Sequence, residues 1–292
     1  MDPIRVACVR YLNTAPLVEG LDKLEGLTLI PAVPADIAPM VRSGKAEIGL
    51  ASVIDAVGDP ELAILPAGMI GSDGPTLTVR LFSSVPLANI TAVCADADSH
   101  TSIALASVLL AEQFGVSPKF VPFNALERVA LGGETVEQDA DGWPATLLLI
   151  GDKVVTHSPP AVRYPHQLDL GEAWKTLTGL PFVYAAWTCR ADAIDTDEGQ
   201  RRMALASAML DRQRRHNATR LDWLVQHWAP KARWPVDLAQ RYIGELLRYD
   251  LGERERESVG KFFELCTKHG ITEAAAPCFA DVSNPSPIPG NA

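Results

Sequence analysis

The sequence predicts an α/β protein with two lobes and a ligand-binding cleft between them. Three observations support this fold class. Short strands and helices alternate through the first 52 residues, a further strand–helix unit lies between two long apolar strands, and the last part of the chain is largely helical. Strands and helices that alternate with short connections are typical of a parallel sheet covered by helices.

The first lobe is predicted from apolar runs that are each followed by a helical pattern. Ser43-Gly44 ends the second of these helices. Residues 76–84 alternate between polar and apolar side chains, which is the period of a strand. The expected elements are strand 4–9, helix 15–23, strand 27–30, helix 34–42, strand 47–52 and strand 76–84.

The second lobe is expected to be inserted into the first. Its predicted elements are strand 90–95, helix 103–114, a strand around 120–121 and the buried strand 146–152. A strand over 181–189 then returns to the first lobe, which helices 199–215, 219–228, 237–248 and 253–269 complete. With crossings near 84–89 and near 180–186, the expected division is 1–86 and 187–276 for lobe one, 87–186 for lobe two, and 277–292 as an irregular, proline-containing tail.

Composition narrows the class of partner. The formal net charge of −10 argues against nucleic acid or an anionic membrane. No apolar run approaches the ~20 residues of a membrane span, and the start of the chain shows no export signal. The five cysteines are scattered, as expected of reduced thiols in the cytoplasm. A homodimer is compatible with this sequence.

No cofactor or metal site is predicted. The six histidines show no ligand spacing, and the chain has no glycine-rich nucleotide motif and no nucleophile elbow. The six tryptophans are interpreted as core residues. We therefore expect a small polar or anionic molecule as the partner, bound without metal or cofactor.

Polar side chains at the ends of predicted strands mark the candidate site, because open α/β sheets bind ligands at the carboxyl ends of their strands. Tyr11, Asn13 and Thr14 follow the first strand, and Ser52 ends the third. The alternative for Asn13 is a role as a helix N-cap.

Two further groups could join this site. Thr101 and Ser102 open the helix 103–114, whose N-terminal N–H groups could hold a carboxylate, although Ser99 or Thr101 could equally act as a cap. Gly151 and Asp152 end a buried strand, where glycine permits close approach to a ligand and aspartate could instead form a turn.

The strand 76–84 supplies the last candidates, because alternate residues of a strand lie on one face. Thr78, Arg80 and Ser83 fall on this strand, and Arg80 is either a partner for a substrate carboxylate or a surface arginine.

Several segments, in order along about residues 4–272, resemble the chorismate dehydratases of the futalosine pathway of menaquinone biosynthesis. The N-terminal segment 10–17, Arg-Tyr-Leu-Asn-Thr-Ala-Pro-Leu, looks like the signature of this family. The other similar segments are 99–105, 148–153, 169–174, 178–187 and 262–265.

The resemblance implies a type II periplasmic-binding-protein fold used for catalysis, and conversion of chorismate to 3-[(1-carboxyvinyl)oxy]benzoate and water. It also implies active-site roles for Asn13 and for a hydroxyl residue before the crossing, mapped to Thr78 in preference to Ser83. Our hypothesis is that both orient the substrate, whose own side-chain carboxylate takes the ring proton, while Thr101, Ser102 and their helix N-terminus hold a carboxylate.

This chain departs from the family pattern at three positions. Arg10 stands where serine is usual, Ser52 where proline is common, and Thr78 where the family carries serine. Threonine keeps the hydroxyl but restricts the χ1 angle. The alternatives are the related dihydroxynaphthoate synthase and a non-catalytic solute-binding protein. A DNA-binding regulator is disfavoured, because no helix-turn-helix or basic face is visible.

Overall fold

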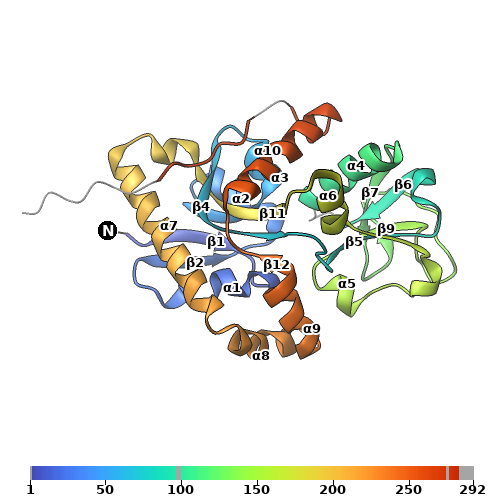
Figure 1. Ribbon diagram of the computed structural model, residues 1–292, viewed down its shortest axis with the longest axis horizontal. Helices are drawn as coiled ribbons and strands as arrows, with labels where there is room; N and C mark the ends of the chain where they lie inside the picture. The colour runs from blue at the N-terminus through green and yellow to red at the C-terminus, as the bar shows by residue number, and fades with distance from the viewer. Residues whose placement is uncertain (1, 97–99, 274–275, 283–292) are drawn as a thin grey trace, which may run out of the picture.

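Two six-stranded sheets, one in each of two lobes, form the framework of the molecule (Figure 1). The computed structural model describes residues 2–96, 100–273 and 276–282. The chain begins in one lobe, enters the other through β5, and returns through β11 (Figure 1). The expected α/β class with two lobes is therefore confirmed.

The first sheet has the strand order β12-β4-β11-β3-β1-β2. β1 pairs in parallel with β2 and β3, whereas β11 is antiparallel to β3 and β4. The strands are β1 (Ile4–Cys8), β2 (Leu27–Pro31), β3 (Ile48–Ser52), β4 (Leu62–Ser72), β11 (Phe182–Arg190) and β12 (Leu247–Arg248).

Most of the helices belong to this lobe, and the C-terminal ones pack beside its sheet (Figure 1). They are η1 (Leu12–Thr14), α1 (Ala15–Val18), η2 (Leu21–Lys23), α2 (Pro34–Arg42), α3 (Val53–Val57), η5 (Ala191–Ile194), α7 (Asp197–Ala218), α8 (Leu221–Ala232), α9 (Val236–Arg241), the π-helical turn η6 (Tyr242–Leu246) and α10 (Glu253–Lys268). α10 also contacts α4 of the second lobe.

The second sheet has the order β10-β5-β9-β6-β7-β8, and β5 is antiparallel to both β10 and β9. Its strands are β5 (Val79–Ser83), β6 (Ala92–Ala95), β7 (Lys119–Asn124), β8 (Val129–Ala130), β9 (Thr146–Ile150) and β10 (His166–Asp169). The helices of this lobe are η3 (Leu87–Asn89), α4 (His100–Phe114), α5 (Lys153–Thr156), η4 (Ala161–Arg163) and α6 (Leu170–Thr178).

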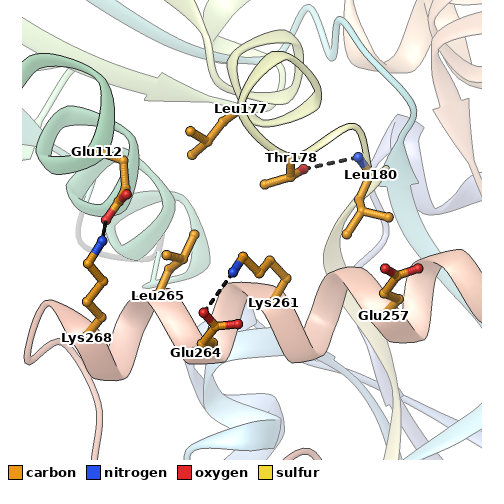
Figure 2. Close-up of a pocket in the computed structure, with 9 residues that line it drawn as sticks. All are labelled: Glu112, Leu177, Thr178, Leu180, Glu257, Lys261, Glu264, Leu265 and Lys268. Atoms are coloured by element: carbon orange, nitrogen blue, oxygen red, sulfur yellow. Dashed lines mark hydrogen bonds and ion pairs between the residues drawn. The ribbon is translucent and has the colours of Figure 1, made fainter.

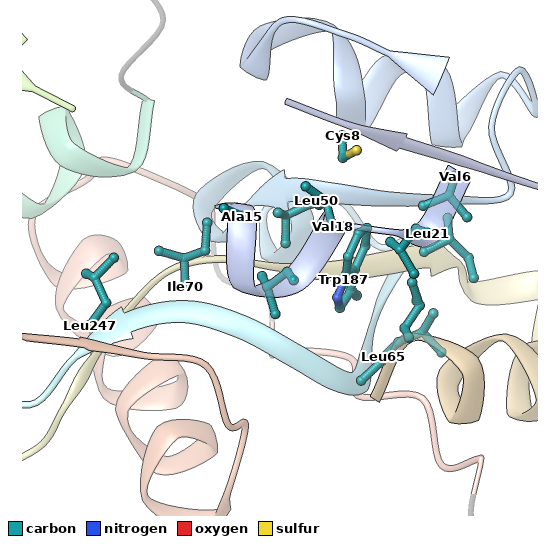
Figure 3. Close-up of a cluster of buried hydrophobic side chains, with 14 of the residues drawn as sticks. Val6, Cys8, Ala15, Val18, Leu21, Leu50, Leu65, Ile70, Trp187 and Leu247 are labelled. Atoms are coloured by element: carbon teal, nitrogen blue, oxygen red, sulfur yellow. The ribbon is translucent and has the colours of Figure 1, made fainter. Parts of the chain in front are cut away.

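Buried aromatic residues fix the positions of the strands that pass between the lobes. Trp187 of β11 is fully buried among Val18, Leu21 and Leu65 (Figure 3). At the start of the same strand, Phe182 makes an edge-to-face contact with Trp174 of α6 at 5.3 Å between ring centroids. Burial of large apolar side chains of this kind contributes about 1.5–3 kcal/mol each, so β11 is held firmly on both sides.

The expected division of the lobes is wrong at its first boundary. β5 pairs with β9 and β10, so it belongs to the second sheet, and the first crossing lies over residues 73–78 instead of 84–89. The predicted strand 76–84 begins only at Val79, because Leu77 has a left-handed backbone with φ of 71°. The second crossing lies over 179–181, since β11 already starts at Phe182.

Other expected elements are confirmed with shifts at their ends, but two differ in kind. The predicted helix 15–23 is interrupted because Gly20 has a φ of +82°. The predicted helix 237–248 is α-helical only as far as Arg241 and continues as a π turn and a short strand. β4 was not predicted, because Pro66 and Gly68 obscure its strand pattern.

Part of the expected irregular tail is ordered. The amide of Ile64 donates to the carbonyl of Cys278, and the amide of Ala280 donates to the carbonyl of Ile64, both at 2.8 Å. Residues 278–280 therefore pair with β4 as a short parallel bridge. Residues 283–292 of the expected tail lie outside the described residues.

Candidate active site

A cavity of about 350 Å³ lies between the two lobes, at the polar ends of strands from both sheets. Among the site candidates that the structure describes, all except Arg80 and Ser83 line it. The lining side chains with polar groups are those of Tyr11, Asn13, Thr14, Ser52, Thr76, Thr78, Asp96, Thr101, Ser102, Asp152, Lys153, Tyr184 and Tyr242. The folded chain thus brings most of the candidates from separate strand ends to one cavity.

The turn after β1 presents Asn13 to the cavity. The Thr14 hydroxyl lies 3.1 Å from the carbonyl of Val9 and 2.9 Å from that of Tyr11, and it accepts the Tyr11 amide at 3.0 Å. Thr14 is fully buried and closes the turn. Asn13 lies inside η1 and is not the N-cap of α1, a position that Thr14 occupies. Its amide oxygen is buried and has no hydrogen-bond partner among the described residues.

An unpaired buried carbonyl oxygen costs about 1–3 kcal/mol. A ligand that donates a hydrogen bond to Asn13 removes this cost, so the amide is prepared for a hydroxyl or N–H group of a bound molecule.

Thr78 lies in the segment that joins the two sheets. Its hydroxyl oxygen is 2.7 Å from the phenol oxygen of Tyr242, and both side chains are buried. Its carbonyl accepts the amide of Gly151 at 2.8 Å. Burial raises the pKa of Tyr242 above its usual range, so the phenol remains neutral and can donate.

Asp169 holds this joining segment in place. Its carboxylate accepts the amides of Thr76 and Leu77 at 2.9 and 2.8 Å, while also capping α6 through the amides of Gly171 and Glu172. A left-handed backbone is unfavourable for a residue with a side chain, and these bonds stabilise it at Leu77. The same carboxylate therefore fixes the turn that positions Thr78.

Thr76 and Tyr184 form a second hydroxyl pair in the cavity. Their oxygens are 2.6 Å apart, and Thr76 also contacts the Ser72 hydroxyl at 2.9 Å. Burial raises the pKa of Tyr184 above its usual range. The segment before β5 thus supplies one hydroxyl of each pair, and η6 and β11 supply the two phenols.

The N-terminal turn of α4 faces the cavity with Thr101 and Ser102, which are 4% and 6% exposed. The Thr101 hydroxyl accepts the amide of Ile54 from the first lobe at 3.4 Å. Beside it, His100 contacts Asp55 at 2.9 Å. Ser52 lines the cavity and makes no side-chain cap to α3. The expected cap Ser99 lies outside the described residues.

Asp152 follows β9 and faces the cavity from the second lobe. Its Oδ1 accepts the indole N–H of Trp234, which belongs to the first lobe, at 2.8 Å. Burial raises the pKa of this carboxyl, and the bond from Trp234 opposes that rise. Next to it, Lys153 forms an ion pair with Asp96. Asp152 is therefore a carboxyl without a cationic partner among the described residues.

Two residues of the predicted strand 76–84 lie elsewhere. Ser83 is fully buried, and its hydroxyl donates to the carbonyl of Val85 at 2.7 Å, so its expected place at the ligand is wrong. Arg80 does not line the cavity and instead contacts Gln167 and Asp169 at 3.2 and 3.7 Å. Arg10 is exposed and lies 5.7 Å from the Trp228 ring centroid.

Sequence reasoning missed Tyr184, Tyr242 and Trp234. Trp234 is 4% exposed, as expected of a core residue, yet it also bonds to Asp152. Its ring stacks on that of Tyr242 at 4.9 Å and 20°. These residues come from β11 and from the α8–α9 region, and no local pattern there indicated a ligand.

A second depression, of about 630 Å³, lies between α6 and α10 and is lined by charged side chains (Figure 2). Lys268 pairs with Glu112 and Lys261 with Glu264, at 2.6 and 2.7 Å. These charges neutralise each other, and no predicted site residue lies here. The described residues contain no cluster of three or more His, Cys, Asp or Glu able to hold a metal ion. None of the described helices is long and apolar enough to cross a membrane.

Solved structures with the same arrangement define the class of protein. A protein from Archaeoglobus fulgidus is similar with a TM-score of 0.64 at 15% identity, over 92% of this chain and 98% of that chain. A Candida albicans gene product that exhibits the generic periplasmic binding protein fold gives 0.62 at 11%, over 97% and 93%. The aliphatic sulphonate binding protein SsuA from Escherichia coli gives 0.56 at 11%, over 100% and 98%. This chain has the periplasmic-binding-protein fold.

Sequence comparison then gives the family. The family model for menaquinone biosynthesis matches residues 4–268. A chorismate dehydratase from Thermus thermophilus is 30% identical over an alignment of 279 residues, and the match covers 90% of this chain and 95% of that protein. The chain belongs to this menaquinone-biosynthesis family.

Proposed function

We propose that this protein is a chorismate dehydratase, a carbon–oxygen lyase that converts chorismate to 3-[(1-carboxyvinyl)oxy]benzoate and water. The observation that carries the proposal is Asn13, which lines the cavity between the lobes and whose buried amide oxygen has no hydrogen-bond partner among the described residues. Asn13 lies in the segment that resembles the family signature, and the Thermus thermophilus relative supports the substrate.

The cavity fits an anionic substrate despite the acidic balance of the whole chain. The N-terminal turn of α4 faces it with Thr101 and Ser102, and helix N-termini attract carboxylates. Lys153 is the cationic side chain among the described residues that line the cavity, and it pairs with Asp96 there. Asn13 offers an acceptor for the ring hydroxyl, so the helix N-terminus and Asn13 provide partners for a carboxylate and for the hydroxyl of chorismate.

The reaction requires orientation and exclusion of water more than a cofactor, because formation of the aromatic ring supplies the driving force. Asn13 and the Thr78 hydroxyl orient the substrate from the two sides of the cleft. The side-chain carboxylate of the substrate takes the ring proton. Tyr242 fixes the direction of the Thr78 hydroxyl through their 2.7 Å contact. We place this cofactor-independent reaction in the cytoplasm, where reduced thiols persist.

Incubation of the purified protein with chorismate, followed by liquid chromatography with mass detection, tests the proposal. We expect loss of one water and appearance of the aromatic enolpyruvyl ether. Asn13→Ala is expected to lower kcat/KM by at least tenfold, whereas the exposed Arg10→Ala leaves it within about twofold. Unchanged chorismate with the wild-type protein would refute the assignment and shift attention to the dihydroxynaphthoate synthase reaction or to solute binding.

A further inference from the structure

We propose that Asp152 is a catalytic acid that protonates the hydroxyl group leaving the substrate. This inference rests on the proposed dehydratase function and adds a role that the orienting residues Asn13 and Thr78 do not fill. Hydroxide is a poor leaving group, and a positioned acid that converts it to water accelerates such steps by about 10²–10⁴.

The position of Asp152 supports this role. Two separate sets of contacts connect it to Thr78, the residue proposed to orient the substrate. The Gly151 amide donates to the Thr78 carbonyl at 2.8 Å, and Asp152 is the next residue along the chain. On its other side, Oδ1 of Asp152 accepts the indole N–H of Trp234 at 2.8 Å. The ring of Trp234 stacks on that of Tyr242, whose phenol oxygen contacts the Thr78 hydroxyl.

These contacts leave one carboxyl oxygen of Asp152 available to the substrate. Trp234 binds Oδ1, and the described residues provide no hydrogen bond to Oδ2. Since the indole N–H can only donate, it must face a lone pair of Asp152. The proton of the acid form is therefore placed on Oδ2, the oxygen of this cavity-lining residue that does not bind Trp234.

The other titratable groups that line the cavity are less suited to give up a proton. Asp96 and Lys153 pair with each other. The phenols of Tyr184 and Tyr242 are bonded to threonine hydroxyls, and burial raises the pKa of both. Tyr11 is 47% exposed and thus meets solvent. Asp152 is partly buried with a raised pKa, which increases its protonated fraction near neutral pH.

In the proposed step, a proton and the hydroxyl group leave from neighbouring ring carbons of the substrate. The ring C–H bond beside the ether oxygen breaks, its electron pair forms the new ring double bond, and the substrate's side-chain carboxylate receives the proton. The neighbouring C–O bond breaks with its pair on oxygen, which takes the proton of Asp152 and leaves as water. The proton held by the product's carboxyl passes through solvent, and Asp152 is protonated again.

Steady-state kinetics with chorismate across a range of pH tests this role through Asp152→Asn. The amide has the same shape and still donates a hydrogen bond, but it is not an acid. We expect kcat to fall about 10²–10⁴-fold with KM changed by less than about threefold. The wild-type kcat should decline as pH rises through the pKa of Asp152, and this decline should be absent from Asp152→Asn.

Trp234→Phe provides a second, independent readout. It keeps an aromatic ring against Tyr242 but removes the N–H donor that lowers the pKa of Asp152. The decline in kcat should therefore move to higher pH. This variant also keeps the proposal testable if Asp152→Asn does not fold.

Three outcomes separate the claims. If the wild-type protein is active and Asp152→Asn has a normal kcat, the acid role alone is overturned. The same holds if Asp152→Asn keeps the pH profile of the wild type. A variant with normal kcat and raised KM assigns Asp152 to binding and overturns it as well. Wild-type protein inert toward chorismate overturns the proposed function and this inference together.

Discussion

The hydroxyl of Thr78 lies 2.7 Å from the phenol oxygen of Tyr242, although 164 residues separate the two in sequence. Tyr242 stands at the start of a π-helical turn, a feature that often occurs at functional sites. The turn directs its ring against Trp234 and its oxygen toward Thr78. The C-terminal region of the chain thus contributes directly to a site whose sequence signature lies near the N-terminus.

We expect Tyr242→Phe to lower kcat/KM for chorismate by roughly 5- to 150-fold, because an unpaired buried hydroxyl costs about 1–3 kcal/mol. The phenylalanine ring retains the stacking on Trp234, so the thermal midpoint should fall only by the few degrees that the unpaired Thr78 hydroxyl costs. Thr78→Ser, which keeps the hydroxyl, is the matched control and should retain activity. Equal activity of Tyr242→Phe and wild type would show that this contact does not orient Thr78.

Asp169→Asn is expected to destabilise the protein. Its carboxylate accepts four backbone amides, two in the joining segment and two at the start of α6. An amide nitrogen in place of one oxygen faces N–H groups and leaves them unpaired, at a cost of about 1–3 kcal/mol. Urea unfolding measures this, with the exposed Asp195→Asn as the control expected within about 0.5 kcal/mol.

Gly171→Ala and Gly260→Ala should change stability in opposite directions. A Cβ at Gly171 would lie 2.1 Å from the Thr76 hydroxyl and 2.5 Å from the Gly74 carbonyl, so backbone must move. At Gly260, in the middle of α10, no atom lies within 4 Å of the added carbon. We expect a lower thermal midpoint for the first and a gain of about 0.5–1 kcal/mol for the second. A stable Gly171→Ala protein would contradict the tight approach of α6 to the joining segment.

Glu112 should make stability depend on pH in the acid range. Hydrogen bonds from Lys268 and His269 hold its pKa below the usual value of 4.5. Because the folded pKa is lowered, the contribution is present above the unfolded pKa and is lost as pH falls through the folded pKa. We expect Glu112→Gln to be less stable than wild type near pH 7 and equal to it at about pH 2.

Chemical unfolding at several pH values measures this difference. Glu264→Gln is the matched control, since this carboxylate is 64% exposed and pairs only with Lys261 among the described residues. Exposed ion pairs contribute about 0–1 kcal/mol. A pH-independent difference for Glu112→Gln would contradict the assigned pairing between α4 and α10.

The strand ends of the site were predictable because their signals are local. Apolar runs followed by polar residues placed Asn13, Ser52 and Asp152 at one cleft, as the structure confirms. The boundary between the lobes was not predictable in this way. Residues 79–83 pair with β9 and β10, whose strands lie more than 60 residues further along the chain, and local alternation says nothing about partners so distant.

The missed residues have a similar explanation. Trp234 and Tyr242 have the apolar surroundings of ordinary core residues, and only the folded chain brings their polar atoms to Asp152 and Thr78. Ser83 shows the reverse case. It lies on the same face of β5 as the cavity-lining Val79, but at the far end of the strand, where its hydroxyl is bonded to the Val85 carbonyl.

The segment that joins the lobes carries Thr76 and Thr78, while Asn13 and Asp152 come from opposite sheets. Opening of the lobes would therefore separate Asn13 from Asp152 as well as admit solvent. Under the proposed roles, a compound that binds at the mouth of the cleft and holds the lobes apart is expected to inhibit the reaction without touching any of these four side chains. Inhibitors of this kind need not imitate the substrate, and changes in residues that hold substrate would not confer resistance to them.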